Sequence, residues 1–292
     1  MIFSSSECIT WLTLLIIVSV TIVTVNLLSV VLFIRNRSLR TRAMYLVINL
    51  TVADIFVGGF SSIYLFAYLL FLCDPGKTHL TLMIITGFLH LWFPLTSLTN
   101  TAAISLERMH ATIRPLRHRL IKKWVYRVTI AGVWVLTAML STAMLIIIVR
   151  YGEWLYRYYV WQSYCCLCLF VICVSYSSIV VKFLCGAHPQ HHGAANRQRK
   201  LTVTLFIMTI VSLFMWLPYA VFTFLEPSII MKFLSSKELQ RLEISLSIIF
   251  LMNSLVNPIV YTIRIPEFRN ALLVLFKRQQ RENADVIHLH VR

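Results

Sequence analysis

The sequence has 292 residues, of which 59% are hydrophobic and 13% are charged, and its mean hydropathy is +0.78. A soluble domain cannot bury so large a share of apolar surface, so the composition excludes a soluble protein and indicates a membrane protein. The formal net charge is +16. We expect most of that charge on one membrane face, where it attracts anionic lipid, and nothing in the sequence supports a nucleic-acid partner.

Seven apolar runs, each about 20 residues or longer, are long enough to cross a lipid bilayer as helices. In chain order they are Trp11–Ile34, Ala43–Cys73, Leu80–Leu106, Val128–Val149, Tyr158–Val181, Leu201–Leu225 and Ile244–Ile263. The alternating segments of about 10 residues that are typical of a β-barrel are absent. The sequence therefore predicts an all-α membrane protein, a bundle of seven transmembrane helices.

Lysine and arginine are distributed unevenly between the connecting segments. Most of the 27 follow the first, third, fifth and seventh apolar runs. Because basic residues concentrate on the cytoplasmic side, we expect the N-terminus outside the cell and the C-terminus in the cytoplasm. Residues 1–10 lack a basic stretch, so we expect no cleaved signal peptide. The predicted organisation is an extracellular segment at 1–10, a transmembrane domain at 11–263 and a cytoplasmic helix and tail at 264–292.

Polar side chains occur at similar depths in several of the apolar runs, and Asp54 is the only formal charge inside any of them. The set is Asn26, Asp54, Ser97, Asn253, Ser254 and Asn257. A lone carboxylate in lipid is costly, so we expect these groups to face one another inside the bundle. Two interpretations stay open: a site for a small hard cation such as sodium at Asp54, or a purely structural hydrogen-bond network.

The last apolar run contains a weak point, the segment LMNSLVNPIVYTIR at residues 251–264. A proline inside a helix removes one backbone hydrogen bond and crowds the carbonyl four residues earlier, which costs roughly 3 kcal/mol. Here Pro258 would crowd Ser254, and the amides of Asn253 and Asn257 are themselves unfavourable in lipid. We interpret this turn as one that can adopt more than one arrangement, with a static kink as the alternative.

Seven features of the sequence occur in the same order in one protein family. They are Asn26, NLTVAD (49–54), ERM (107–109) followed by RPLRHR (114–119), Trp134, Tyr176, MWLP (215–218) and NPIVY (257–261). With these motifs the chain resembles the rhodopsin-like, or class A, G-protein-coupled receptors over almost its whole length. The segment FRNALLVLF (268–276) suits the short amphipathic cytoplasmic helix that follows the seventh span in that family.

The resemblance implies a plasma-membrane receptor, not an enzyme, that binds an extracellular ligand and activates a heterotrimeric G protein. The coupling and switch residues that it implies are Glu107, Arg108, Leu116, Tyr176, Trp216, Pro218, Asn257, Pro258 and Tyr261. Glu107 would hold Arg108 until activation, and Leu116 would be the apolar anchor in the G protein. A seven-helix channel or transporter, and a receptor-like protein that acts without a ligand, are the alternative functions.

The resemblance also places a ligand pocket in the outer half of the bundle. Its residues would be Tyr64, His90, Leu91, Pro94, Tyr164, Trp216, Tyr219, Thr223 and Ser247. His90 stands where amine receptors carry an aspartate, and Leu251 stands where opsins carry the retinal-binding lysine. We therefore expect no amine ligand, no retinal and no other cofactor. A neutral or weakly anionic small molecule fits this pocket, although the ligand, small molecule or peptide, stays unknown, and His90 could equally be a packing residue.

The sequence also departs from the family pattern. The usual cysteine at the outer end of the third span is missing, and Met83 occupies that position. The cysteines on the outer side are Cys8, Cys73, Cys165 and Cys166. We expect a bond between Cys73 and either Cys165 or Cys166, and the sequence alone does not set the pairing. These departures loosely resemble the melanocortin and adenosine receptors. At the base of the sixth span, where many family members carry an acidic residue, the chain has Gln198. That position cannot form an ion pair with Arg108, so we expect raised activity without a ligand.

Overall fold

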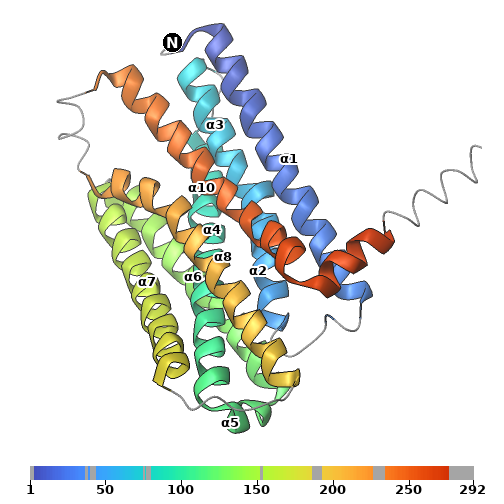
Figure 1. Ribbon diagram of the computed structural model, residues 1–292. Helices are drawn as coiled ribbons and strands as arrows, with labels where there is room; N and C mark the ends of the chain where they lie inside the picture. Colours follow the sequence, from blue (N-terminus) through green and yellow to red (C-terminus); the bar gives the residue numbers. More distant parts are fainter. Residues whose placement is uncertain are drawn as a thin grey trace, which may run out of the picture.

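The seven apolar runs all form long helices in the computed structural model, and the predicted seven-helix bundle is confirmed (Figure 1). The structure describes residues 3–36, 39, 44–74, 76, 80–151, 154–185, 193–225 and 234–275. The side chains at 80, 151, 154–158, 183, 185 and 193–201 lie outside that description, as does the tail at 276–292. No strand occurs among the described residues.

The first three membrane-spanning segments are formed by five elements of the chain. They are α1 (Ser5–Arg35), α2 (Met44–Phe56), the π-helical turn η2 (Val57–Ser61), α3 (Ser62–Cys73) and α4 (Leu80–Ile113). The elements α2, η2 and α3 are continuous and cross the bundle as one segment, Met44–Cys73. The short helix α5 (Pro115–Arg119) follows α4 at the end of the bundle opposite the N-terminus, and we call this the α5 end (Figure 1).

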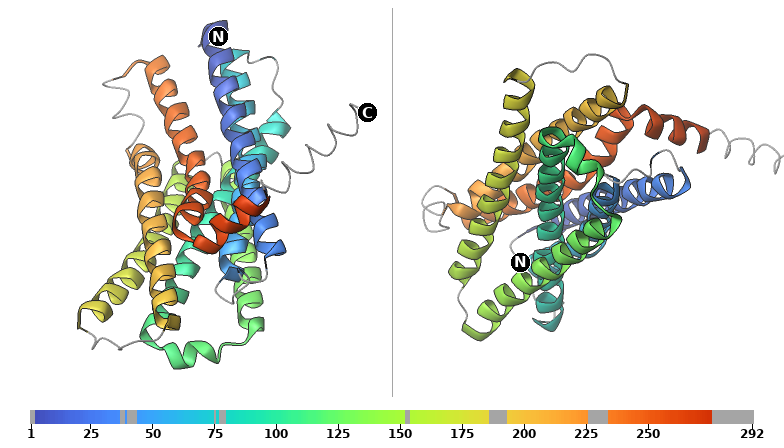
Figure 2. Two further views of the ribbon diagram at one scale, coloured as in Figure 1. Left: turned by 45° about the vertical axis from the view of Figure 1, so that its right-hand side comes forward. Right: turned by 90° about the horizontal axis from the view of Figure 1, so that it is seen from below.

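The remaining segments are α6 (Lys123–Tyr151), α7 (Trp154–Cys185), α8 (Gly193–Phe224) and α10 (Ser236–Arg264). Residues 266–275 form a further helix, which leaves the bundle at an angle at the foot of α10 (Figure 1). Helix α4 lies in the middle of the bundle when it is viewed along its length, and it contacts α2, α3, α6, α7 and α8 (Figure 2). Side chains of α4 can therefore reach most of the other helices.

Two of the long helices begin at a serine cap, which explains where they start. The Ser4 side chain accepts a hydrogen bond from the Glu7 backbone N–H, and the Glu7 carboxylate accepts one from the Ser4 backbone. Ser235 and Glu238 form the same reciprocal capping box at the start of α10. Such boxes satisfy backbone N–H groups that a helix N-terminus leaves without partners.

Helix α1 approaches the π-helical turn very closely at Gly58. A β-carbon at this position would lie 2.5 Å from the Ile22 side chain, so only glycine fits without movement of α1. Ile22 is fully buried there, and the Ser62 hydroxyl donates a hydrogen bond to the Gly58 carbonyl. The extra residue of the π-helical turn shifts the register of the segment, and its irregular backbone is stabilised by this serine.

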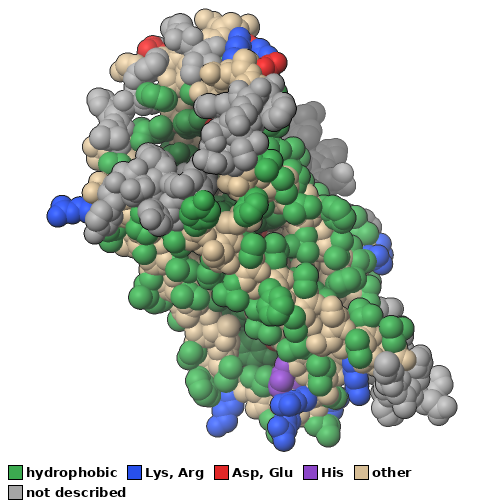
Figure 3. All heavy atoms as spheres, turned by 90° about the vertical axis from the view of Figure 1, so that its left-hand side faces the viewer, with side chains coloured by type: hydrophobic (Ala, Val, Ile, Leu, Met, Phe, Trp, Pro, Cys, Tyr) green, Lys and Arg blue, Asp and Glu red, His purple; other side chains and the backbone are tan. Residues whose placement is uncertain are grey.

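The surface of the bundle suits a lipid environment. On one face, a broad band of hydrophobic side chains covers the middle of the molecule, and Lys and Arg side chains gather toward both ends (Figure 3). Large apolar residues such as Phe170, Phe214 and Phe224 are exposed on the helices. In water such a surface would be unstable, whereas in a bilayer these side chains contact lipid chains.

Candidate functional site

The Asp54 carboxylate joins three helices in the centre of the bundle. Its Oδ1 accepts hydrogen bonds from the Ser97 hydroxyl at 2.8 Å and the Ser254 hydroxyl at 2.9 Å. Its Oδ2 accepts a hydrogen bond from Asn257 Nδ2 at 2.5 Å. Asp54 is fully buried, so these three donors replace the water that the carboxylate has lost. Asp54 on α2, Ser97 on α4 and two residues of α10 thus come together.

Asn26 compensates for the proline of α10. Pro258 has no N–H, so the Ser254 carbonyl lacks its usual partner within the helix. Asn26 Nδ2 donates a hydrogen bond to that same carbonyl at 2.9 Å, and it also bonds to the Ile22 carbonyl on its own helix at 3.0 Å. A side chain of α1 therefore satisfies the backbone of α10, and the kinked turn depends on the neighbouring helix.

Asn253 belongs to the same region but has a different environment. It lines a small cavity between α4, α7, α8 and α10, together with Ser97, Thr209, Ser212 and Trp216. The side-chain oxygen of Asn253 is buried and has no hydrogen-bond partner among the described residues. A polar cavity beside such an oxygen is suited to an ordered water molecule. Asn253 is therefore near Asp54 but not bonded to it.

A second buried network lies beside the first. Trp134 Nε1 donates a hydrogen bond to Asn49 Oδ1 at 3.0 Å, and Asn49 Nδ2 donates one to Asn100 Oδ1 at 2.6 Å. These contacts join α6, α2 and α4. The motif NLTVAD thus contributes its first residue to one network and its last residue, Asp54, to the other.

At the α5 end, three side chains meet around the Glu107 carboxylate, and we call these four residues the Glu107 cluster. Arg108, of which only 2% is exposed, forms an ion pair with Glu107. On the other carboxylate oxygen, His118 Nε2 lies 2.7 Å and the Tyr126 hydroxyl 3.3 Å away. His118 belongs to α5 and Tyr126 to α6, so three elements share this carboxylate. His118 lies within the quoted motif RPLRHR, but sequence reasoning gave it no role.

The aromatic switch residues have well-defined partners. The Tyr176 hydroxyl on α7 lies 3.2 Å from the Thr209 hydroxyl on α8. Tyr261 is fully buried, and its ring packs against Phe268 of the helix at 266–275 with the ring centres 5.9 Å apart. The Trp216 ring lies 4.6 Å from the ring of Phe250 on α10. Sequence reasoning missed Phe250, which is an apolar residue in an apolar run.

The predicted pocket residues fall into two groups. Tyr64 stacks on His90 with ring centres 4.8 Å apart, and His90 Nδ1 lies 3.3 Å from the Ser61 carbonyl. The second group surrounds Phe250, which contacts both Trp216 and Tyr219. The Tyr164 hydroxyl lies 2.8 Å from the Thr99 hydroxyl, and the Thr223 hydroxyl donates a hydrogen bond to the Tyr219 carbonyl. The other predicted pocket residues, Leu91, Pro94 and Ser247, are buried. Near the N-terminal end, the surface is hollowed and hydrophobic side chains are visible inside (Figure 3).

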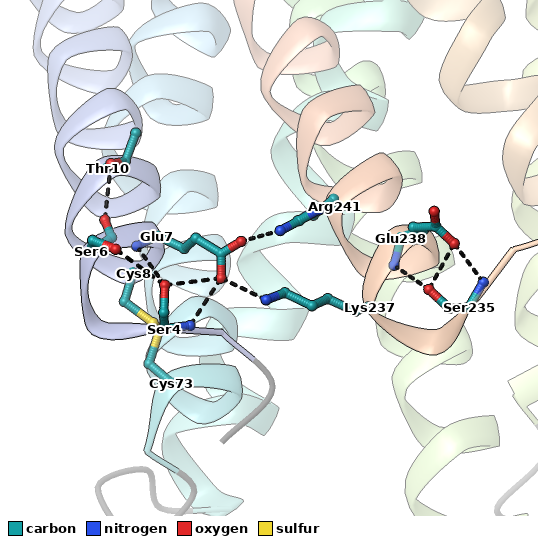
Figure 4. Close-up of polar contacts among 10 residues, drawn as sticks. All are labelled: Ser4, Ser6, Glu7, Cys8, Thr10, Cys73, Ser235, Lys237, Glu238 and Arg241. Atoms are coloured by element: carbon teal, nitrogen blue, oxygen red, sulfur yellow. Dashed lines mark hydrogen bonds and ion pairs between the residues drawn. A yellow bond between two sulfur atoms is a disulfide. The ribbon is translucent and has the colours of Figure 1, made fainter.

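The disulfide prediction was wrong. Cys73 pairs with Cys8, whose Cα atom lies 6.1 Å from that of Cys73, whereas Cys165 and Cys166 are both free (Figure 4). The reason is the packing of the helices: the first turn of α1 lies beside the last turn of α3. Cys165 is instead buried in a hydrophobic cluster with residues of α4, α7, α8 and α10. In the sequence, Cys8 and Cys73 lie at the same end of two neighbouring apolar runs, and this position could have predicted their pairing.

Next to this disulfide, Glu7 joins α1 to α10. Its carboxylate forms ion pairs with Lys237, at 2.9 Å, and with Arg241, and we call these three residues the Glu7 cluster (Figure 4). Lys237 and Arg241 are four residues apart, so they lie on the same face of α10. Together with the disulfide, this cluster fastens the first turn of α1 to both α3 and α10.

The arrangement defines a seven-helix membrane protein with buried polar networks at its centre and an arginine–glutamate pair at one end. A family model described as "7 transmembrane receptor (rhodopsin family)" matches residues 25–261. Because this match covers most of the sequence, the chain belongs to the rhodopsin family of seven-transmembrane receptors. It is thus a multi-pass membrane receptor, not an enzyme, that binds an extracellular ligand and signals through a G protein.

The curated relatives include substance-K receptors and receptors for tachykinin-like peptides. The chain is 24% identical to the substance-K receptor of Canis lupus familiaris, over 91% of this chain and 75% of the relative. The human substance-K receptor is also 24% identical, over 91% and 72%. The tachykinin-like peptides receptor 86C of Drosophila melanogaster is 24% identical, over 77% of this chain and 50% of its own length. The looser likeness to melanocortin and adenosine receptors stays a prediction.

Proposed function

We propose that this receptor lies in the plasma membrane with its N-terminus outside the cell, and that its extracellular ligand is a peptide. The orientation is supported by the excess of lysine and arginine after alternate spans. A peptide is supported by the relatives, which include a receptor named for tachykinin-like peptides. It is also supported by the hollow near the N-terminal end, which would then face the extracellular medium (Figure 3). Residues 1–10 would be extracellular and 264–292 cytoplasmic.

The single observation that carries the proposed mechanism is the burial of Arg108 in its pair with Glu107. In this arrangement the guanidinium is closed to any protein that approaches the α5 end. We expect the ligand to move α8 and α10 through the contact of Trp216 with Phe250. The half of α8 toward the α5 end then swings outward at Pro218, and Arg108 becomes accessible to the G protein.

Asp54 is proposed as the site of an allosteric sodium ion. The oxygen atoms of the Asp54 carboxylate and of the Ser97 and Ser254 hydroxyls already face one another, and hard cations bind such oxygen ligands. Asn257 currently points its nitrogen at Asp54, so it would have to turn to contribute its oxygen. The described residues contain no group of three or more His, Cys, Asp and Glu that could hold a metal ion, so any such site depends on hydroxyl and amide oxygens.

The proposal is tested in cells that express the receptor with an epitope tag at its N-terminus. Antibody binding to intact cells is expected, and a tag detected only after permeabilisation would reverse the orientation. A panel of synthetic tachykinin-like peptides is then applied, with recruitment of a labelled heterotrimeric G protein to the membrane as the readout. Peptide-dependent recruitment is expected.

Two comparisons make this test specific. Tyr219→Ala should weaken the response to the peptide, because Tyr219 lies in the predicted pocket, whereas the lipid-facing Phe214→Ala is the matched control. Activation by a small molecule but by no peptide would contradict the ligand class. Recruitment that no added ligand changes would favour the ligand-independent alternative.

A further inference from the structure

The position of His118 gives this residue a role that the family motifs do not assign. We propose that His118 is the positioning residue of the second cytoplasmic loop, because it fastens α5 to Glu107 and so fixes the direction in which Leu116 faces the G protein. We further propose that this contact strengthens when the imidazole takes up a proton. The part of the inference that concerns the G protein rests on the proposed function, whereas the ordering of the loop does not.

The geometry of α5 carries the first step. Residues two apart on a helix point in nearly opposite directions, since each residue turns the helix by about 100°. Leu116 is 76% exposed, whereas the His118 side chain is only 16% exposed and faces α4. The contact between His118 Nε2 and Glu107 therefore presents Leu116 outward. Through this hydrogen bond the five-residue helix is joined to α4.

Several titratable and charged groups surround the imidazole. From α4, Glu107 lies 2.7 Å away, Arg108 lies on the other oxygen of the same carboxylate, and the His110 ring centre is 5.9 Å from that of His118. From α6, the Tyr126 hydroxyl lies 3.3 Å away. On α5 itself Arg117 and Arg119 are exposed, and so is Arg114, which directly precedes this helix. Among the residues that the structure describes, Glu107 is the anion in direct contact with His118, and Arg108 and His110 oppose a further positive charge.

The sign of the pH effect follows from that contact. Histidine side chains as a class change charge between about pH 5 and 8. A protonated imidazole donates a charge-assisted hydrogen bond to Glu107, which is roughly twice as strong as a neutral one. A charged imidazole therefore holds the loop to Glu107 more firmly than a neutral one does. It follows that the fastening is strongest at lower cytoplasmic pH and weakens as the pH rises.

The first experiment measures loop order without a G protein. A spin label is attached to Leu120→Cys, an exposed position directly after α5, in a background with Cys166, Cys173 and Cys185 replaced by serine. The receptor is purified in nanodiscs of neutral lipid, and the mobile fraction of the label is recorded at pH 6 and pH 8. We expect the ratio of mobile to ordered label to rise about fivefold between the two, because the charged hydrogen bond is more favourable than the neutral one by about 1 kcal/mol, which corresponds to that change in an equilibrium ratio.

Four substitutions at three positions separate the explanations. His118→Gln keeps a neutral donor that can reach Glu107 but cannot titrate, so at both pH values its label should resemble that of the parent at pH 8. His118→Ala should be mobile at both. His110→Asn and Arg117→Gln, which change the neighbouring histidine and an exposed charge of α5, should respond to pH as the parent does. A flat parent profile, a pH response that persists in His118→Gln, or an ordered label in His118→Ala would each overturn the inference.

A second readout links the loop to signalling. Nucleotide exchange by purified heterotrimeric G protein is measured with the same variants, with each pH profile divided by that of His118→Gln to remove the response of the G protein itself. The parent should lose activity relative to His118→Gln as the pH rises, and His118→Ala should be low throughout. Exchange by none of the proteins would contradict the proposed function, whereas the label data would still decide the role of His118.

Discussion

Two glutamates near opposite ends of the bundle each accept contacts from two basic side chains, yet their environments differ. Glu7 is 24% exposed and joins α1 to α10 through Lys237 and Arg241. Glu107 is 9% exposed and is shared by Arg108 and His118. The Glu7 cluster adjoins the disulfide of Cys8, whereas only hydrogen bonds and ion pairs hold the Glu107 cluster. One end of the receptor is thus covalently fixed, and the other can rearrange.

The difference matches what a receptor of this family has to do. In the proposed orientation, a covalent link between α1 and α3 keeps these helices together while a ligand enters from the N-terminal end. In the proposed mechanism the α5 end opens for a G protein, so its contacts have to be reversible. Solvent exposure adds a second contrast: salt screens the Glu7 cluster strongly, whereas the buried Glu107 cluster is screened much less.

The largest expected effect comes from removing the arginine of the Glu107 cluster. Arg108→Ala should reduce G-protein activation to the level of cells without receptor, because the proposed contact with the partner is lost. Surface expression should remain largely intact, since His118 and Tyr126 still contact Glu107. The measurement is G-protein recruitment at matched surface levels, with the exposed Arg114→Ala as control. Normal signalling by a well-expressed Arg108→Ala receptor would remove Arg108 from the mechanism.

Breaking the covalent link should have the next largest effect, this time on stability. The Cys8–Cys73 bond closes a loop with a sequence separation of 65 residues. Loss of such a link typically destabilises a protein by about 2–4 kcal/mol, and less where the unfolded chain retains its helices. Cys8→Ser with Cys73→Ser should therefore lower the thermal midpoint of the purified receptor. The control is Cys166→Ser, an exposed free thiol, and equal midpoints for all three proteins would show that this end does not need the bond.

Asp54 lies in the centre of the bundle, and a substitution there tests whether a bound cation changes the affinity for the ligand. Asp54→Asn keeps the size of the side chain but removes the charge that a cation requires. We expect agonist affinity in the parent to fall as sodium replaces a large organic cation, and we expect that dependence to vanish in the variant. A coupling of about 1.4 kcal/mol would correspond to a tenfold change in affinity. A parent receptor without any sodium effect would leave Asp54 as part of a structural network only.

The fold could be predicted from the sequence because bilayer thickness fixes the length of a spanning helix, and all seven apolar runs obey that limit. The contacts of Asp54 with Ser97, Ser254 and Asn257 could be anticipated for a related reason: a charge in lipid requires polar partners, and few were available. The pairing of Asn26 with the Ser254 carbonyl was less accessible, since it depends on how closely α1 approaches α10.

The contacts that could not be predicted depend on packing between helices. Composition does not distinguish Cys8 from Cys165 as the partner of Cys73, because only the docking of α1 on α3 decides it. His118, Tyr126 and Glu7 are ordinary polar residues of loops and helix ends, where sequence patterns predict solvent exposure. Their roles follow from the positions of α5 and α10, which hydrophobic periodicity does not specify.

An added charge could strengthen the reversible end. Gln198 is at the position where many family members carry an acidic partner for the arginine, and its side chain lies outside the described residues. Gln198→Glu should lower ligand-free G-protein activation by up to about tenfold, the effect of a pair that contributes roughly 1.4 kcal/mol. Because Glu107 already holds Arg108, the decrease should be partial. The comparison requires matched surface levels, with Gln198→Asn as the neutral control, and unchanged or higher basal activity would contradict the expectation.

The smallest effect should come from the Glu7 cluster itself. Glu7→Gln keeps the capping of α1 by Ser4 but removes the charge that Lys237 and Arg241 share. Since these side chains are partly exposed and the disulfide remains, the thermal midpoint should fall less than in the cysteine variant. The difference from the parent should disappear at about 1 M salt, where the Debye length is roughly 3 Å. Lys232→Gln, which changes a basic residue upstream of α10, provides a comparison in which one charge of the opposite sign is lost. If the thermal midpoint of Glu7→Gln stays below that of the parent at high salt, Glu7 acts through packing and not through its charge. Solvent exposure would then not explain the difference between Glu7 and Glu107.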